Sequence, residues 1–166
     1  LGQGILTALT QIAADELDVD PSRIRLVPAT TGLSPDEAVT SGSLSVQECG
    51  MALRHACADA RAIFLSVAEQ THGSPLRVED GRFLDERGRE VASYWSLADR
   101  DLLAFEASPD ARPKRPEERR VAGASLARLD LALLVVGAVV VRRGRGELRG
   151  TCINRLVHRA HAERLA

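Results

Sequence analysis

Two short segments of small and polar residues could bind an anionic group. Gly2-Gln3-Gly4 comes directly before one apolar-periodic stretch, and Thr40-Ser41-Gly42-Ser43-Leu44-Ser45 comes directly before another. Glycine lets backbone amides approach a ligand closely, and the first amides of a helix are unpaired donors at the positive end of its dipole. Ser43 and Ser45 add hydroxyls, and Gln3 adds a side-chain amide that donates and accepts. The pattern indicates a site for phosphate or another oxyanion, although the same residues also serve as flexible helix entrances and N-caps.

Apolar spacing predicts a helix after each of these segments. The first helix is expected over Ile5 to Leu17, where apolar residues three and four apart form one stripe. Three polar residues fall away from that stripe, namely Gln11, Asp15 and Glu16. The second helix is expected from Val46 to His72, with Gly73 as its stop signal. Between the helices, Ala29 to Gly42 lacks periodicity and is interpreted as a binding loop.

Shorter patterns predict a small sheet. Arg23 to Pro28 alternates as a strand. Two turn signals, Asp80-Gly81 and Glu86-Arg87-Gly88, separate three strand candidates that would form an antiparallel meander, Leu76–Val78, Arg82–Leu84 and Glu90–Ala92. Ser93 to Leu103 is expected to be a last helix, with Trp95 adding a large apolar surface to the core. The predicted fold class is α+β, with two helices packed on a small mixed sheet.

The composition is that of a globular domain. The 166 residues are 45% hydrophobic and 27% charged, with 22 basic and 23 acidic side chains, which excludes a disordered or generic nucleic-acid-binding protein. Three cysteines are too few and of the wrong parity for a disulfide framework, which indicates a reducing compartment. The longest apolar run, Leu131 to Val141, is shorter than the roughly 20 residues of a membrane-spanning helix.

Charge and proline content divide the chain. Residues 131–166 carry seven Arg and two Glu, a net charge of +5, so the first 130 residues carry −6. Pro109, Pro113 and Pro116 lie among charged residues and predict an extended linker that does not pack. We therefore expect one domain over residues 1–105, a linker over 106–120 and a following unit over 121–166. That unit would open with a short strand at Val121 and Ala122 and end in an Arg-rich tail.

The stretch from Gly2 to Leu17, GQGILTALTQIAADEL, resembles a segment of the molybdopterin-binding large subunits of the xanthine dehydrogenase and aldehyde oxidase family. In that family a G-Q-G turn, a helix, an edge strand, a Thr/Pro-rich loop and an S-x-S turn follow in this order and help to enclose the molybdenum cofactor. The resemblance extends from Leu1 to about Leu131 and is strongest to isoquinoline 1-oxidoreductase-like and nicotinate dehydrogenase-like large subunits. Arg128-Leu129-Asp130 is similar to the opening of the next domain. The chain is thereby expected to be part of a larger molybdenum-cofactor-binding domain.

This resemblance implies cofactor-binding residues at both small polar segments. It places three residues beside the metal and its oxo or sulfido ligands, with the glutamine hydrogen-bonding toward them: Gly2, Gln3 and Gly4. It places three more on the other side of the cofactor: Gly42, Ser43 and Ser45. It assigns no catalytic residue and no protein ligand to the metal. The family's general base, a glutamate near the far end of a much longer chain, has no match here, and Glu16, Glu37 and Glu48 do not take that role.

The same resemblance implies an activity and partners. Family members hydroxylate an aldehyde or an N-heteroaromatic carbon with oxygen from water and pass two electrons to iron–sulfur clusters. The implied cofactor is molybdenum–molybdopterin in its cytosine dinucleotide form. The implied partners are an iron–sulfur small subunit, the remainder of the large subunit and a small substrate, with no nucleic acid. The expected location is cytoplasmic, or periplasmic if an export signal precedes Leu1. Alone, the chain is expected neither to retain cofactor nor to turn over.

The residues also permit a function of a different class, a non-catalytic interaction module. Its long helix would pack on a partner, and its Arg-rich tail would bind acidic surfaces. The resemblance stops after Asp130, where charge and composition also change, which suggests a frameshifted or truncated gene; a genuine strand and basic helix is the alternative. Within the tail, Arg142, Arg143, Arg145 and Arg149 are interpreted as a solvated basic face.

Two further groups of potential ligands have simpler structural explanations. His158 and His161 are three residues apart on a possible helix, but no third ligand is near them in sequence, so they are interpreted as surface histidines. Cys49 and Cys57 lie within an apolar stripe and lack the spacing of an iron–sulfur site. We expect these cysteines to pack in the core as small hydrophobic residues.

Overall fold

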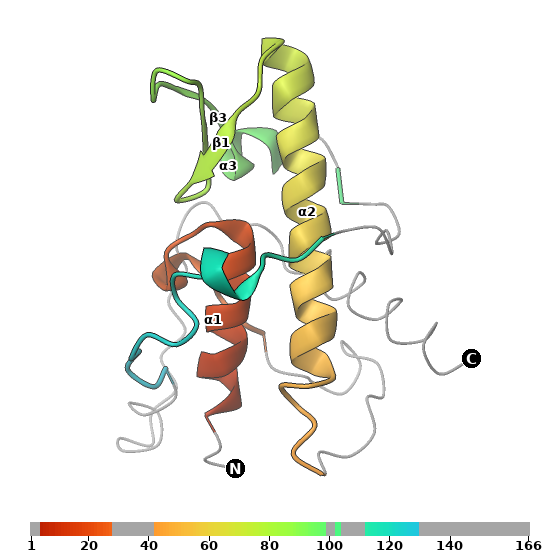
Figure 1. Cartoon of the computed structure of the whole chain (residues 1–166), viewed down its shortest axis with the longest axis vertical. Coiled ribbons are helices and arrows are strands. Elements are labelled where there is room, and N and C mark those ends of the chain that lie inside the picture. The colour runs from red at the N-terminus through yellow and green to blue at the C-terminus, as the bar shows by residue number, and fades with distance from the viewer. Residues whose placement is uncertain (1–3, 28–41, 99–101, 104–111, 130–166) are drawn as a thin grey trace, which may run out of the picture.

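Two helices form the frame of the structure (Figure 1). The computed structural model describes residues 4–27, 42–98, 102–103 and 112–129. Helix α1 covers Ile5–Leu17, as predicted, and ends at Asp18, whose φ of 52° breaks the helical geometry. Helix α2 covers Cys49–His72 and begins three residues after the predicted Val46. It ends where predicted, at Gly73, because the φ of 71° at this position favours glycine.

The two helices pack side by side and run in the same direction (Figure 1). A Cβ built on Gly50 would lie only 3.0 Å from Ile12 Cδ1, so glycine permits the close approach of α2 to α1. One turn further along each helix, Arg54 of α2 pairs with Glu16 of α1. The contacts thus advance in the same direction along both helices, which makes the pair parallel. The N-terminal ends of α1 and α2 consequently lie at the same end of the molecule.

A three-stranded antiparallel sheet packs near the C-terminal end of α2 (Figure 1). Its strands are β1 (Arg77–Glu79), β2 (Arg82–Leu84) and β3 (Glu90–Ser93), in the order β1-β2-β3. Asp80 and Gly81 have φ of 48° and 75° and form the predicted tight turn between β1 and β2. The predicted meander and the α+β class are thus confirmed, and the sheet is antiparallel rather than mixed.

The predicted strand at Arg23–Pro28 is wrong for the residues that the structure describes. Residues Pro21–Arg23 form a short 3₁₀ helix, η1, and residues 24–27 form no strand; Pro28 lies outside the described residues. Ile24 and Leu26 are half-buried between exposed neighbours, so the alternation reports one-sided burial of an extended segment and not pairing in a sheet.

The last helix is shorter than predicted. Helix α3 covers Tyr94–Leu97 and is capped reciprocally by Ser93 and Ser96. The core aromatic residue of this helix is Tyr94, which packs edge-on against Phe64 and Phe83. Trp95 is half-buried and lies under the guanidinium of Arg23, 4.8 Å from it.

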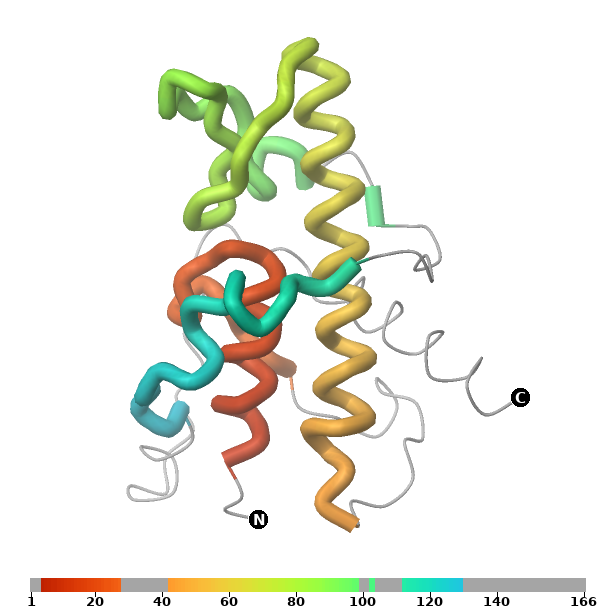
Figure 2. The backbone as a smooth tube through the Cα atoms, in the orientation of Figure 1, coloured from red at the N-terminus to blue at the C-terminus, as the bar shows by residue number. Residues whose placement is uncertain are grey.

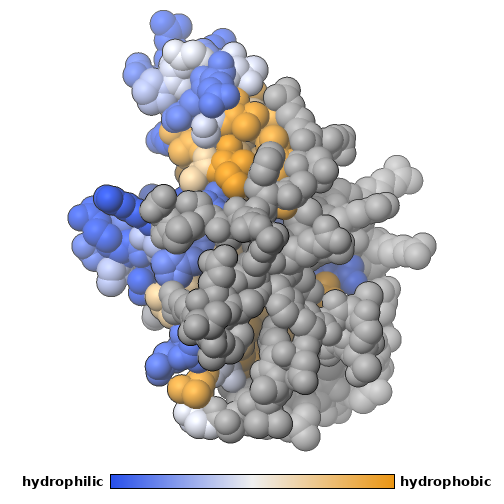
Figure 3. All heavy atoms as spheres, turned by 90° about the vertical axis from the view of Figure 1, so that its right-hand side faces the viewer, coloured by the Kyte–Doolittle hydropathy of each residue, from blue (hydrophilic) through white to orange (hydrophobic). Residues whose placement is uncertain are grey.

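The hydrophobic core joins one face of each helix to the sheet. Its buried members are Ala13, Ala14, Leu17, Val19, Leu53, Cys57, Ala60, Phe64, Ala68, Phe83, Tyr94 and Leu97. On the face shown in Figure 3, apolar residues lie just below a hydrophilic tip at the sheet end of the molecule. None of the helices in the described part of the chain is long and apolar enough to cross a membrane.

Residues 112–129, which we call the strap, run along α1 (Figure 2). The backbone N–H groups of Arg120, Val121 and Ala122 donate to the carboxylate of Asp15 at 2.7–2.8 Å. The expectation that residues 106–120 do not pack is therefore wrong from Lys114 onward. Val121 and Ala122 lie in a bend and turn and not in the predicted strand, because both of their N–H groups donate to the same Asp15 carboxylate. The proposed domain limits stay a prediction.

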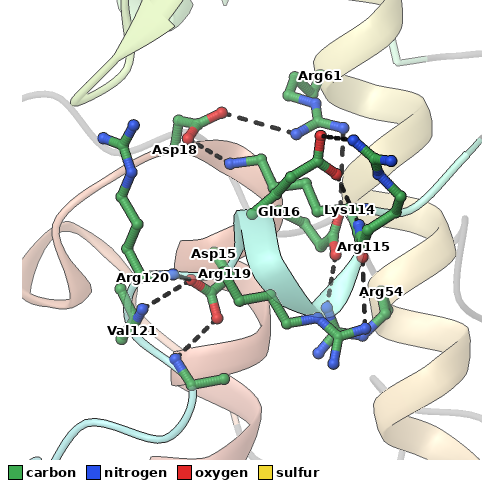
Figure 4. A network of polar contacts seen from close by, with 12 residues as sticks. Asp15, Glu16, Asp18, Arg54, Arg61, Lys114, Arg115, Arg119, Arg120 and Val121 are labelled. Atoms are coloured by element: carbon green, nitrogen blue, oxygen red, sulfur yellow. Dashed lines mark hydrogen bonds and ion pairs between the residues drawn. The ribbon is translucent and has the colours of Figure 1, made fainter.

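A buried ion pair links α1, α2 and the strap (Figure 4). Glu16 is fully buried, and its Oε1 lies 2.6 Å from Arg54 Nη1 of α2, which is also buried. The other oxygen, Oε2, accepts the backbone N–H of Lys114 at 3.0 Å. Arg61 of α2 lies between this carboxylate and Asp18, at 4.0 and 3.6 Å. Asp15 and Glu16 thus lie off the apolar stripe, as predicted, yet both are buried.

Glu16→Gln should destabilise the fold by about 3 kcal/mol, because it leaves the buried Arg54 guanidinium without its counter-charge. Urea unfolding measures the change. Glu79→Gln is the matched control, since the carboxylate of Glu79 is exposed and lies 3.9 Å from an exposed Arg77. Equal stability of the two variants would show that the buried pair does not hold the helices together.

Gly81→Ala should cost about 2–4 kcal/mol of stability, because a Cβ there would lie 2.5 Å from the Trp95 ring in a left-handed backbone conformation. Gly73→Ala is the control: its φ of 71° is similar, but no heavy atom lies within 4 Å of the added Cβ. Thermal unfolding should give a loss of only about 1 kcal/mol for Gly73→Ala. Comparable losses would rule out the contact with Trp95.

Tyr94→Phe should leave stability unchanged or raise it by about 1 kcal/mol, because the buried Tyr94 hydroxyl has no hydrogen-bond partner among the described residues. Burial also raises the pKa of this phenol. Tyr94→Leu removes the ring that contacts Phe64 and Phe83 and should destabilise the protein clearly. Calorimetry distinguishes the two, and a large loss in Tyr94→Phe would contradict this assignment.

Candidate functional site

The first candidate segment ends at Gly4, which caps α1. Gly2 and Gln3 lie outside the described residues. Gly4 has a φ of 72°, and its carbonyl accepts the N–H groups of Thr7 and Ala8 at 3.1 and 3.2 Å. No side chain caps this end of α1, and its first turn contains no acidic residue. The first amides of the helix therefore meet no carboxylate of their own turn, which suits an anionic ligand.

Residues 42–45 of the second candidate segment form a turn that leads into α2, whereas Thr40, Ser41 and residues 29–41 of the predicted binding loop lie outside the described residues. Gly42 and Ser43 both have positive φ, of 61° and 58°, which is uncommon for serine. The Leu44 carbonyl accepts the N–H of Glu48 at 2.7 Å, and the Ser45 carbonyl accepts the N–H of Gly50 at 3.0 Å. Gly42 and Ser43 are exposed and Ser45 is half-buried, so the two hydroxyls border solvent. As in α1, the first turn of the helix carries no acidic residue.

The parallel arrangement of the helices brings the two segments to one end of the molecule. Gly4 precedes α1 and Gly42, Ser43 and Ser45 precede α2, and the N-terminal ends of α1 and α2 lie at the same end (Figure 1). No hydrogen bond joins the two segments within the described part of the chain. The arrangement can therefore present backbone amides at the start of α1 and the hydroxyls of Ser43 and Ser45 to one shared ligand.

Sequence reasoning missed a cationic neighbour of the first segment. The Nε of Arg128 lies 3.6 Å from the position that a Cβ on Gly4 would occupy. The next residue, Leu129, donates its N–H to Thr7 Oγ1 at 3.0 Å and so holds the end of the strap against the first turn of α1. No local pattern could have paired residues more than 120 positions apart. The resemblance assigned this stretch to the next domain.

The structure also bears on the other titratable residues. Cys57 is 1% exposed, and burial raises the pKa of its thiol to about 12, so it packs as a neutral core residue as predicted. Cys49 is half-buried at the start of α2. Among the residues that the structure describes, no three His, Cys, Asp or Glu side chains form a group that could hold a metal ion. The histidines and arginines singled out in the tail, and Glu37, lie outside the described residues.

Comparisons with known proteins identify the family of this chain. Residues 1–126 match the family described as the molybdopterin cofactor-binding domain. A nicotinate dehydrogenase subunit of Pseudomonas putida is 34% identical over 134 residues, which cover 79% of this chain and 11% of that protein. Aldehyde oxidase 4 of Rattus norvegicus is 37% identical over 57 residues, which cover 34% of this chain and 4% of that protein. No solved structure matches the chain significantly.

The matched relatives are thus many times longer than this chain, which spans about a tenth or less of their length. The family match nevertheless includes both candidate segments and most of the strap. On this match, the chain belongs to the molybdopterin cofactor-binding domain of the xanthine dehydrogenase and aldehyde oxidase family.

Proposed function

We propose that this chain forms part of the cofactor site in the large subunit of a molybdenum hydroxylase. The observation that carries the proposal is the placement of two glycine-containing helix entrances at one end of a parallel helix pair. Six residues would contact the cofactor: Gly2, Gln3, Gly4, Gly42, Ser43 and Ser45. The complete protein would oxidatively hydroxylate an aldehyde or an N-heteroaromatic compound, the two substrate classes in the names of the relatives.

The donors present at these entrances fit an anionic molybdopterin group. Molybdopterin carries phosphate, and the metal carries oxo or sulfido ligands, so the cofactor offers hydrogen-bond acceptors and negative charge. The start of α1 offers backbone amides and no carboxylate in its first turn. At the start of α2, whose N-cap is Glu48, the amides of Glu48 and Gly50 are paired with Leu44 and Ser45, and the donors are the hydroxyls of Ser43 and Ser45. The left-handed backbone at Ser43 is the kind of local strain that is kept at binding sites.

The chain's own residues would bind and orient the cofactor. When bound, the cofactor supplies the redox chemistry that joins oxygen from water to the substrate carbon and removes two electrons. Gly4 and Gly42 would let the backbone pass close to it, and Gln3 would donate a hydrogen bond toward the ligands of the metal. Glu16 takes no part as a base, because its carboxylate is fully buried against Arg54. The general base would come from another part of the large subunit.

The partners follow from the same proposal. The electrons would leave through iron–sulfur clusters on a small subunit, and the cofactor would be the cytosine dinucleotide form. The relative from Pseudomonas putida is itself named as a subunit, which supports a multi-subunit complex. The remainder of the large subunit would complete the substrate pocket. The strap, whose last described residues lie beside the first turn of α1, would lead the chain toward it.

Replacing Ser43 and Ser45 together by Ala should weaken cofactor binding about 10²-fold to 10⁴-fold, because two hydrogen bonds to charged groups contribute about 1.5–3 kcal/mol each. The double variant is made in the complete polypeptide that contains these residues, in a host that synthesises the cofactor. Molybdenum by mass spectrometry and pterin by fluorescence of its oxidised form measure the content. Gln3→Ala should lower both readouts in the same way.

Ser74→Ala is the matched control, since Ser74 is exposed directly after α2, at the end of the molecule away from both entrances. It should retain the wild-type molybdenum and pterin content. Full content in the Ser43/Ser45 and Gln3 variants would contradict the assigned site. Absence of cofactor from the wild-type complex as well would favour a non-catalytic interaction module.

A further inference from the structure

One face of α1 is a polar stripe that contacts the strap along its length. Thr7, Gln11 and Asp15 are spaced by four residues, which places them on the same side of the helix, and Asp18, the C-cap, follows just beyond the helix end. We call these four residues the α1 stripe. The strap lies beside this face, and both elements are described over the whole contact (Figure 2).

The contacts follow a strict antiparallel order. Near the C-terminal end of α1, Asp18 accepts a hydrogen bond from Lys114 Nζ. Next, the carboxylate of Asp15 accepts the backbone N–H groups of residues 120–122 at 2.7–2.8 Å. Then Gln11 Nε2 donates to the carbonyls of residues 121 and 124 at 3.1 and 3.0 Å. Finally Thr7 Oγ1 accepts the N–H of residue 129 at 3.0 Å.

This docking depends on the backbone of the strap and hardly on its side chains. Apart from Lys114 Nζ, the strap atoms in these hydrogen bonds are backbone N–H and C=O groups. Asp15 is 3% exposed, and among the described residues it forms no ion pair, so the strap amides satisfy its charge. The docked strap thus satisfies a carboxylate that it helps to bury, and its release would expose that carboxylate to water.

The strap ends beside the candidate cofactor turn. Thr7 lies in the first turn of α1, three residues after Gly4, and its hydroxyl holds Leu129. Arg128 consequently lies over Gly4, with its Nε 3.6 Å from the Cβ position of that glycine. A single run of hydrogen bonds therefore connects the buried carboxylates at the C-terminal end of α1 to the turn at its N-terminal end.

We propose that docking of the strap on the α1 stripe and binding of the cofactor at the Gly4 turn are coupled. The docked strap fixes the first turn of α1 in the geometry that receives the cofactor. By reciprocity, a bound cofactor stabilises the docked strap, and release of the strap lowers cofactor affinity. The coupling rests on the proposed function, whereas the docking of the strap does not. Thr7 and Asp15 act in it as positioning residues.

Hydrogen exchange at the strap amides tests the proposal in the complete polypeptide, with cofactor and after growth without molybdate. Asp15→Asn replaces one acceptor oxygen by an N–H₂ group that faces backbone N–H donors. Exchange of the amides of residues 120–122 should then become at least 10-fold faster in both preparations. In the wild type, bound cofactor should slow hydrogen exchange at the amides of residues 120–122 and 129. The Asp15→Asn variant should contain about 10-fold less molybdenum than the wild type.

Three variants accompany this measurement. Thr7→Val keeps the shape of the side chain and removes only the acceptor of the Leu129 N–H, so it tests the coupling even where Asp15→Asn fails to fold. It should accelerate exchange at Leu129 and lower molybdenum content. Arg120→Ala alters an exposed strap side chain and should change neither readout, since Asp15 contacts only the backbone of Arg120. Glu79→Gln also replaces a carboxylate by an amide, at an exposed position of β1, and should leave exchange rates and molybdenum content as in the wild type.

The outcomes separate the claims. Unchanged exchange at residues 120–122 and 129 in Asp15→Asn and Thr7→Val would overturn the docking role of the α1 stripe. Faster exchange with full molybdenum content would overturn the coupling and leave the proposed function intact. A wild type that binds no cofactor would overturn the proposed function and the coupling together, while the exchange rates would still report on the docked strap. The coupling would be established if bound cofactor slows exchange of the strap amides in the wild type and has no such effect in Asp15→Asn and Thr7→Val.

Discussion

The arrangement of this domain depends on the buried carboxylate of Glu16. A carboxylate without water is stable only when its charge and both of its oxygens are satisfied, and here the partners come from two separate elements. Arg54 of α2 pairs with one oxygen, and the backbone of Lys114 in the strap donates to the other. Both elements must therefore take fixed positions against α1. A shift of α2 by one helical turn would leave two opposite charges buried apart, so the pair specifies the register of the helices.

That register places the candidate site. Apolar packing alone, through small residues such as Ala13, Ala60 and Gly50, would tolerate more than one alignment of two helices. The ion pair selects the parallel alignment in which both N-terminal ends lie together. The opposite end carries the sheet and a hydrophilic tip (Figure 3). The candidate site and the sheet are thus separated along the long axis of α2, and the polar network joins α1, α2 and the strap (Figure 4).

Local signals predicted much of the fold, and long-range polar contacts account for what they missed. The helix over Ile5–Leu17, the end of α2 at Gly73 and the turn at Asp80-Gly81 follow from periodicity and from residues that favour positive φ. The strap follows from no such signal, because its backbone amides bind Asp15 across more than 100 residues. A charged, proline-containing sequence that docks through its backbone has the composition of a linker. Of the predicted site, the structure describes the residues at both helix entrances except Gly2 and Gln3, and their role in binding was inferred from resemblance and dipole arguments.

The separation between Asp15 and its partners also has a consequence during synthesis on the ribosome. Helices α1 and α2 can pair once His72 has emerged, but Ala122 follows 50 residues later. At typical elongation rates this interval lasts about 2.5–10 s. During it, the Asp15 carboxylate has none of its strap partners and remains exposed to water. Arrival of the strap then supplies the backbone N–H groups that the Asp15 and Glu16 carboxylates accept, so the polar network is the last part of this structure to be completed in translation.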